Sequence, residues 1–421
     1  MAAQFHLRGG VLHCEEVPLP HIAQQVGTPV YVYSAGAMRD NVGALRGALS
    51  ELDEPLIAYA VKANPNAAVL ATLAAEGLGA DIVSGGELLR ALAAGIAADK
   101  IVFSGVGKTR DEMRLALDAG ICQFNLESGD EAAVLSEVAV ALGREARVGF
   151  RVNPDVEPGT HAKISTGGAT SKFGIPIADA LGEYAAARAL SGLKVQGVAV
   201  HIGSQLTSLH PFERAFSVVG GLIAELRVQG HEITIADLGG GLGVLYDPDA
   251  PQPPGPQAYG EMVRRVTRNW NVRLVFEPGR FLVGNAGVLL TEVIRVKAGA
   301  DHPFVIVDAA MNDLMRPTLY DAWHRIEAVR PVGGRMTANV VGPVCETGDT
   351  FATGREIDSA NAGDLFVFRT AGAYAATMAS TYNSRPLTPE VLVDGDRWAV
   401  VRPRVAVEEM IAGDIVPEWL A

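Results

Sequence analysis

Short apolar runs rich in β-forming residues alternate with amphipathic stretches of helical period through the first two thirds of the chain. The runs lie at residues 56–62, 80–84, 100–104, 122–126, 147–152, 195–202, 233–238 and 273–277. The helical stretches between them include 66–76, 86–94 and 111–119. Strand–helix alternation repeated eight times predicts an α/β fold with a (β/α)8 TIM-like barrel, and a doubly wound open sheet is the structural alternative.

The pattern changes after about residue 280. Apolar β-like runs follow with few long helices between them, at 287–296, 304–308, 335–341, 364–369 and 397–403. This pattern of apolar runs predicts a second, mostly β domain, either a β-barrel or a sandwich. Residues 30–34 form one more strand-like run ahead of the barrel, so the N-terminus is expected to join the β domain. We therefore predict a barrel over residues 28–279 and a β domain built from residues 1–27 and 280–421.

Composition narrows the classes of function. The 421 residues are too many for one ordinary domain, and the net charge of -13 argues against nucleic acid and anionic membranes as partners. Cys14, Cys122 and Cys345 are far apart, which argues against a disulfide scaffold and a cysteine zinc site, so no metal is expected. The chain shows neither a signal pattern at its start nor an apolar run of membrane-spanning length, so we predict a cytoplasmic protein.

Lys62 ends the first apolar run. On a strand, Ala58, Ala60 and Lys62 would share one face. A lysine in a core is costly unless it is paired or used, and desolvation makes an amine a better nucleophile. Two interpretations stay open for this segment. Lys62 is either a Schiff-base lysine or a strand-end lysine whose ammonium reaches water.

A barrel enzyme carries its chemistry at the C-terminal ends of its strands. The glycine run at 239–241 follows the seventh apolar run, where it could direct N–H groups at an anion or form a mobile turn. Glu277 ends the eighth run, where it could face a cofactor ring nitrogen or form a surface ion pair. His201 lies near the end of the sixth run and Ser204 follows it, and they could supply a stacking ring and a phosphate-binding hydroxyl, although a lone histidine is more often structural.

Taken together, these segments resemble a known family. They are Y-A-V-K-A-N at 59–64, H-I-G-S at 201–204, the glycines at 239–241 and E-P-G-R at 277–280. They look like the fold-type III pyridoxal phosphate (PLP) decarboxylases, which combine an alanine racemase-like barrel with a β domain. Further strings resemble the diaminopimelate decarboxylases in particular. These are T-H-A-K-I at 160–164, K-F-G at 172–174, M-R-P-T-L-Y at 315–320 and C-E-T-G-D at 345–349.

The resemblance implies roles around PLP. Lys62 would carry the cofactor as a Schiff base, Glu277 would face the ring nitrogen and His201 would stack on the ring and take part in catalysis. Supporting and phosphate-binding positions are implied for Asp81, Arg151, Ser204, Gly239, Gly240, Gly241, Gly279, Arg280 and Tyr374. A carboxylate at the ring nitrogen keeps that nitrogen protonated, which strengthens the ring as an electron sink and favours decarboxylation.

The resemblance also implies a substrate and an assembly. Cys345 would be the acid that protonates Cα, although a cysteine is as easily a small apolar core residue. Substrate-binding positions are implied for Arg280, Arg316, Tyr320, Glu346 and Tyr374. The implied reaction converts meso-diaminopimelate to L-lysine and CO2, the final step of lysine biosynthesis. The site would be shared across a homodimer, with Cys345 and Glu346 from the opposite subunit.

Two alternatives stay open at this point. One is a related fold-type III enzyme, such as a decarboxylase of ornithine, arginine or another basic amino acid, or a racemase. The other is a non-catalytic relative that keeps the barrel and has lost its chemistry.

Overall fold

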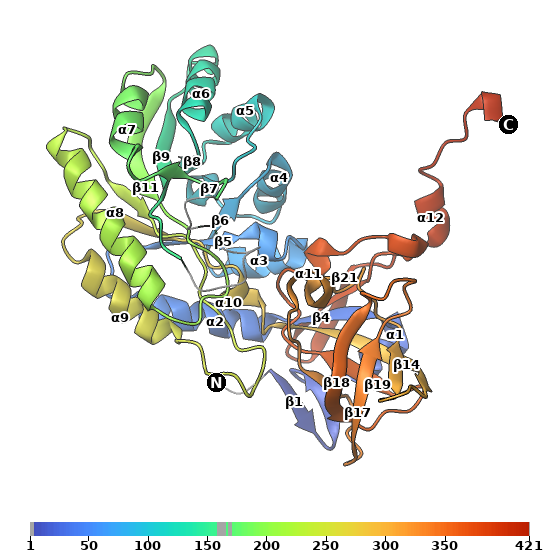
Figure 1. Cartoon of the computed structure of the whole chain (residues 1–421). Coiled ribbons are helices and arrows are strands. Elements are labelled where there is room, and N and C mark those ends of the chain that lie inside the picture. Colours follow the sequence, from blue (N-terminus) through green and yellow to red (C-terminus); the bar gives the residue numbers. More distant parts are fainter. Residues whose placement is uncertain (1–3, 158–165, 167–170, 421) are drawn as a thin grey trace. The chain divides into compact units, whose positions relative to one another are not determined.

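The computed structural model describes residues 4–157, 166 and 171–420. The chain forms two compact units (Figure 1). The barrel unit comprises Arg39–Leu245 and Pro251–Leu282, and the β unit comprises Met1–Met38, Tyr246–Ala250 and Val283–Ala421. The division at residues 28 and 279 stays a prediction.

Eight parallel strands close into a barrel. They are β5 (Leu56–Ala60), β6 (Gly79–Ile82), β7 (Ile101–Phe103), β8 (Gln123–Leu126), β9 (Ala146–Asn153), β11 (Leu193–Ala199), β12 (Ile235–Asp237) and β13 (Arg273–Phe276). Each pairs with the next, and β13 pairs back to β5, so the sheet has no open edge. A two-residue strand, β10 (Ile175–Pro176), adds to β9. The predicted TIM-like barrel is confirmed, and the doubly wound alternative is wrong.

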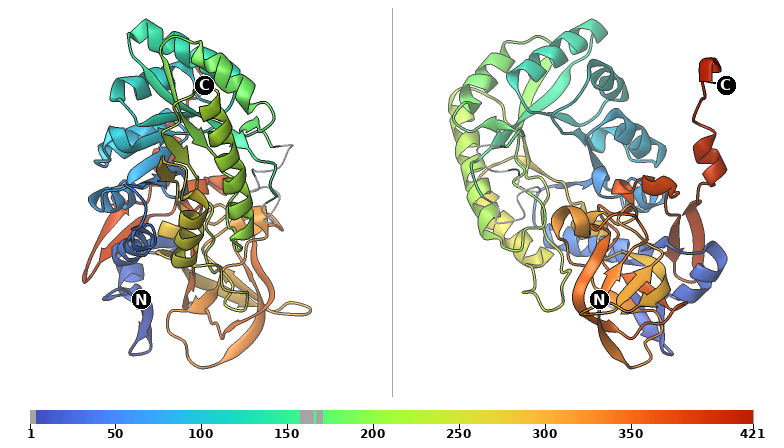
Figure 2. Two further views of the ribbon diagram at one scale, coloured as in Figure 1. Left: turned by 90° about the vertical axis from the view of Figure 1, so that its left-hand side faces the viewer. Right: turned by 45° about the vertical axis from the view of Figure 1, so that its right-hand side comes forward.

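Helices lie outside the ring of strands (Figures 1 and 2). They are α2 (Ala35–Ala48), α3 (Ala67–Ala75), α4 (Gly85–Ala93), α5 (Arg110–Ala119), α6 (Gly129–Leu142), α7 (Ala180–Arg188), α8 (His210–Val228) and α9 (Pro256–Thr267). Helix α5 shows why the sequence begins a helix where it does. Thr109 caps the first turn in a reciprocal pair with Glu112, and the helix buries Met113, Ala116 and Leu117 at helical spacing.

The position of Lys62 in the structure differs from the predicted position on a strand face. Strand β5 ends at Ala60, and Lys62 lies in the one-turn 3-10 helix η1 (Val61–Ala63). The turn forms because the Asn64 N–H donates to the Val61 carbonyl at 3.1 Å, and Pro65 follows. Lys62 therefore does not share a strand face with Ala58 and Ala60.

The β unit is built on a mixed sheet in the order β18-β17-β15-β14-β4-β20-β21, with β19 also paired to β14 and β16 to β19. The strands are β4 (Val30–Ser34), β14 (Gly287–Lys297), β15 (Phe304–Val307), β16 (Ile326–Ala328), β17 (Arg335–Val341), β18 (Thr350–Asp358), β19 (Leu365–Phe368), β20 (Glu390–Asp394) and β21 (Arg397–Arg402). The mostly β second domain is confirmed, and β4 lies between β14 and β20 as part of it. Strands β16, β18 and β20 of this sheet were not predicted.

Smaller elements complete the β unit. They are β1 (Phe5–Arg8), β2 (Val11–Cys14), β3 (Val17–Pro18), α1 (Leu19–Val26), α11 (Arg316–Tyr320) and α12 (Val407–Ile411), with short turns η4 (Ala376–Met378), η5 (Tyr382–Ser384) and η6 (Glu418–Leu420). Two short elements adjoin strands of the barrel: η2 (Ala98–Lys100) precedes β7, and α10 (Arg280–Val283) follows β13. Within the described residues, no helix has the length and apolarity that a membrane span requires.

Candidate active site

A cavity of about 380 Å³ opens at the C-terminal ends of the barrel strands. Its polar lining residues come from different strands or from the segments directly after them. They are Lys62, Ser104, Asn125, Arg151, Thr166, His201, Asp237 and Glu277. The barrel thus gathers, at one end, side chains that are far apart in the sequence. Four of the predicted site residues, Lys62, Arg151, His201 and Glu277, line this cavity.

Lys62 is held by a buried carboxylate. Its Nζ lies 2.6 Å from Oδ2 of Asp81, whose side chain is fully buried at the end of β6. The Lys62 side chain is 35% exposed and lines the cavity. Its ammonium therefore pairs with protein at the cavity wall, which argues against the interpretation of a lysine that only reaches for water.

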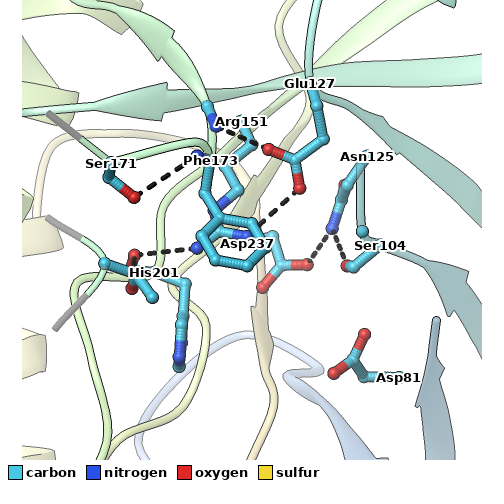
Figure 3. A network of polar contacts seen from close by, with 12 residues as sticks. Asp81, Ser104, Asn125, Glu127, Arg151, Ser171, Phe173, His201 and Asp237 are labelled. Carbon is cyan, nitrogen blue, oxygen red and sulfur yellow. Dashed lines mark hydrogen bonds and ion pairs between the residues drawn. The ribbon is translucent and has the colours of Figure 1, made fainter. Parts of the chain in front are cut away.

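Asp237, which is labelled in Figure 3, forms a second buried acidic group together with Glu277. One amide nitrogen, Asn125 Nδ2, lies 2.8 Å from Asp237 Oδ2 and 3.5 Å from Glu277 Oε1. Ser104 Oγ donates to the same Glu277 oxygen at 3.2 Å. Burial raises the pKa of both carboxyl groups, and for Glu277 repulsion from Asp237 and Asp81 raises the pKa further.

His201 is a neutral ring in this site. Its Nδ1 accepts a hydrogen bond from the Gly240 N–H at 3.1 Å, so the proton of the neutral ring lies on Nε2. Burial lowers the pKa of His201 well below its usual value, and the positive charges of Arg151 and Lys62 lower it further. A neutral imidazole can lie against an aromatic cofactor without adding charge.

Arg151 is fixed from three sides. Its Nη1 donates to Glu127 Oε1 at 3.1 Å, its Nη2 donates to the His201 carbonyl at 3.2 Å, and its guanidinium stacks 4.7 Å from the centre of the Phe173 ring. Figure 3 shows these groups beside Asp237 and Asn125. Arg151 thereby joins the ends of β8 and β9 to the segment that follows β11.

The glycine run after β12 is required by close packing. A Cβ on Gly240 would lie 2.1 Å from the Glu277 carbonyl, and a Cβ on Gly239 or Gly241 would lie 2.5 Å from another backbone oxygen. Gly239 and Gly241 also have positive φ, 65° and 114°. The N–H groups of Gly239 and Gly240 donate to Asp237 and His201. These glycines hold β12, His201 and Glu277 together, and their role towards a phosphate stays a prediction.

Ser204 and Arg280 meet at a second point in the barrel unit. Arg280 Nη2 donates to Ser204 Oγ at 3.0 Å, and Arg280 is buried at the start of α10. Gly279 precedes it, and its carbonyl accepts the Leu282 N–H at 3.1 Å. The structure therefore brings two predicted anion-binding side chains together.

The remaining predicted residues belong to the β unit. Arg316 and Tyr320 are the first and last residues of α11. Cys345 and Glu346 are exposed. Tyr374 has the left-handed φ of 54°, uncommon for a residue other than glycine. The string T-H-A-K-I at 160–164 lies outside the described residues.

Sequence reasoning missed four residues of this network. Ser104, Asn125, Glu127 and Asp237 were not predicted as site residues, yet each contributes a hydrogen bond at the cavity end of the barrel. Their signal was present in the sequence, because each is polar and lies at the end of an apolar run. Polar groups at the C-terminal ends of barrel strands are candidates for chemistry.

Comparison with known proteins identifies the family. Residues 41–284 match the family "Pyridoxal-dependent decarboxylase, pyridoxal binding domain". The diaminopimelate decarboxylase of Zymomonas mobilis is 54% identical over 418 residues, covering 99% of both chains. The chain belongs to the diaminopimelate decarboxylase family. The diaminopimelate decarboxylase of Neisseria meningitidis serogroup A is 48% identical, over 96% of this chain and 99% of that one. The crystal structure of the M. jannaschii enzyme in complex with L-lysine superimposes with a TM-score of 0.95 at 36% identity, over 99% of both chains.

The cavity fits the cofactor of this family. It presents an amine on Lys62, a buried carboxyl on Glu277 and a neutral flat ring on His201. Asp81 Oδ1 is a buried oxygen without a hydrogen-bond partner, so the carboxylate beside Lys62 can still accept a hydrogen bond from a bound group. An aromatic aldehyde with a basic ring nitrogen matches these three groups in chemical type.

The neutrality of His201 makes stability depend on pH. The folded pKa is below that of an unfolded histidine, so the unfolded chain binds a proton that the native state does not. The contribution of His201 to the free energy of unfolding is fully present above about pH 6.5. Below that pH, the free energy of unfolding falls by up to about 1.4 kcal/mol per pH unit until the pKa of the folded state is reached. We expect the wild type to lose stability over this window more steeply than His201→Asn, measured by chemical denaturation at a series of pH values. The exposed His210→Asn is the control and should keep the wild-type slope; equal slopes in all three proteins would contradict the assignment.

Proposed function

We propose that this protein is a PLP-dependent decarboxylase that converts meso-diaminopimelate to L-lysine and CO2, as the last step of lysine biosynthesis in the cytoplasm. The observation that carries the proposal is the pairing of Lys62 with the buried Asp81 at the edge of the cavity that Glu277 also lines. An amine available for covalent attachment and a carboxyl for a ring nitrogen are the two groups that a pyridoxal decarboxylase requires.

Residues of the barrel unit would hold the cofactor. Lys62 would attach to it, with Asp81 and Arg151 in support, His201 would lie against its ring and Glu277 would face its nitrogen. The phosphate would be held by Ser204, Gly279, Arg280 and the turn formed by Gly239, Gly240 and Gly241, with Tyr374 also reaching it. When bound, the cofactor supplies an electron sink for the electrons left behind as CO2 departs.

Arg316 is suited to bind the distal carboxylate of the substrate. Its guanidinium is buried, lies 4.4 Å from the centre of the Tyr246 ring and donates to His324 Nε2 at 2.8 Å. His324 Nδ1 in turn donates to the Arg369 carbonyl at 2.8 Å, which leaves Nε2 as the acceptor. A guanidinium fixed in this way loses little entropy on binding a carboxylate. We propose that Arg280, Tyr320, Glu346 and Tyr374 complete the recognition of the two distal substrate groups.

We further propose that the site is completed in a homodimer. Cys345 and Glu346 are exposed on the β unit, where a second copy of the chain can be reached. In this arrangement Cys345 would deliver the proton to Cα after CO2 leaves, and Glu346 would bind the distal ammonium of the substrate.

A CO2-release assay tests the reaction and the substrate together. Purified protein loaded with PLP should release CO2 from meso-diaminopimelate and should be at least about 100-fold less active on ornithine or arginine, because these lack the distal carboxylate. Lys62→Ala should abolish both the activity and the cofactor absorbance of the attached form. Ornithine activity without diaminopimelate activity would overturn the substrate, and a fully active Lys62→Ala variant would overturn the mechanism.

Removing the Arg316 guanidinium should weaken substrate binding. We expect Arg316→Met to raise the KM for meso-diaminopimelate by about 10- to 100-fold, because a charge-assisted hydrogen-bonded pair contributes about 1.5–3 kcal/mol. Arg335→Met is the matched control, since Arg335 is an exposed arginine of the same unit that pairs with Glu356. An Arg316→Met enzyme with the wild-type KM would refute this role.

Mixing two inactive variants tests the shared site. Lys62→Ala and Cys345→Ala, unfolded and refolded together, should recover about a quarter of wild-type activity, because half of randomly formed dimers would be mixed and each mixed dimer would hold one intact site. Each variant refolded alone provides the baseline. No recovery from the mixture would place Lys62 and Cys345 of each site on the same chain.

A further inference from the structure

Asp237 is a buried carboxyl that the proposed function leaves without a role. It is 1% exposed at the end of β12 and lines the same cavity as Glu277, which is 7% exposed. The two groups share one amide nitrogen of Asn125. Each carboxyl group also shifts the pKa of the other: Glu277 acts to lower the pKa of Asp237, and Asp237 acts to raise the pKa of Glu277.

The hydrogen-bond donors around the pair are unequal. Asp237 accepts the Gly239 N–H at 2.9 Å and the Asn125 amide at 2.8 Å, one on each oxygen. Glu277 accepts longer contacts, 3.2 Å from Ser104 and 3.5 Å from Asn125, both on Oε1. Hydrogen bonds to a carboxylate favour its charged form. The charge is therefore better stabilised on Asp237, and the proton on Glu277.

The orientation of the Asn125 amide is itself fixed. Gln123, fully buried two residues earlier on β8, donates from Nε2 to Asn125 Oδ1 at 2.9 Å. This bond uses the amide oxygen and turns the NH2 group towards the two carboxyl groups. Both polar residues project into the barrel from the same face of β8.

The local charge favours one bound proton. Among the described residues, Asp81 on β6 acts on both carboxyl groups, Lys62 on η1 acts on Glu277, and Asp237 acts on Tyr259 of α9. Arg151 lines the same cavity, but its charge is paired with Glu127. Burial raises the pKa of Tyr259, so its hydroxyl stays neutral. Three carboxyl groups thus face one ammonium, and two excess negative charges in a buried site are costly. One proton on the pair reduces that excess to one.

We propose that Asp237 and Glu277 hold a single proton between them, that Asn125 confines it to Glu277, and that Asp237 is the positioning residue that maintains this state. The inference rests on the proposed function in one respect: the proton then lies on the carboxyl that would face the cofactor nitrogen. Transfer to that nitrogen breaks the Glu277 O–H bond and forms an N–H bond, with no change in electron count. The site would thus supply the ring proton from within, without drawing it from water.

Infrared spectroscopy of the full-length protein free of cofactor tests the proton directly. A protonated-carboxyl band present in the wild type near neutral pH and absent from Glu277→Gln is expected. Labelling glutamate with 13C should shift this difference band, and labelling aspartate should not. The proposal would be overturned if the wild-type minus Glu277→Gln difference spectrum showed no such band, or if the band shifted on labelling aspartate.

Substitutions test the role of the partner. The Glu277 band of Asp237→Asn is obtained by subtracting the spectrum of the double variant that also carries Glu277→Gln. This band should titrate at least about one pH unit lower than in the wild type, because the negative charge of Asp237 is gone. Asp313→Asn removes a carboxyl buried in the β unit and should leave the titration unchanged. An unchanged midpoint in Asp237→Asn would refute the coupling.

A second variant guards against loss of folding in Asp237→Asn. Asn125→Ser removes the amide that stabilises the charge on Asp237, so the difference band should respond to both the glutamate and the aspartate label. A band that still follows glutamate alone would exclude Asn125 as the group that confines the proton.

These experiments distinguish a failure of the shared-proton proposal from a failure of the proposed function. In the loaded protein, 15N in the cofactor ring should report a protonated nitrogen that loses its proton at lower pH in Asp237→Asn than in the wild type. If Lys62 does not bind PLP, the infrared band of the cofactor-free protein remains as predicted. If the proton is not shared, PLP still binds to Lys62 while the band is absent.

Discussion

The site depends on keeping three carboxyl groups buried at one end of a barrel. Asp81, Asp237 and Glu277 are each less than a tenth exposed. A buried carboxylate costs several kcal/mol unless charge or hydrogen bonds compensate it. Lys62 compensates Asp81, and the Asn125 amide with a backbone N–H compensates Asp237. Glu277 receives weaker donors, and it is the group for which we infer a proton.

The same constraint explains the neutral and cationic groups around the cavity. Lys62 and Arg151 lower the pKa of His201, so the ring remains uncharged beside them. The Arg151 charge is compensated by Glu127, which also accepts the Gly174 N–H at 2.5 Å. The charges are thus compensated in pairs along the strand ends. Asp81, Asp237 and Glu277 remain as the acidic groups near Lys62, where an electron-deficient cofactor ring is expected.

The β unit holds its candidate substrate residues with comparable rigidity. His324 and the Tyr246 ring fix the Arg316 guanidinium. The carboxylate of Asp349 accepts the N–H groups of Met311 at 2.6 Å and Val344 at 2.7 Å, which ties the segment bearing Cys345 to the one leading into α11. Side chains held by buried hydrogen bonds lose little entropy when a ligand binds. The precision of such a site comes from packing within the unit.

The sequence by itself determined the barrel, the mostly β second unit and the family, because strand periodicity and the strings around Lys62, Glu277 and Arg316 are local features. Closure of the barrel decided the rest. It brings Asn125 to Asp237 and Glu277, which are 112 and 152 residues away in the chain. It also brings Asp81 beside Lys62, which a local turn has taken off the expected strand face, and it explains the glycines at 239–241 by backbone packing. A carboxyl's proton affinity depends on neighbours in space, so only the tertiary structure could show where the proton lies.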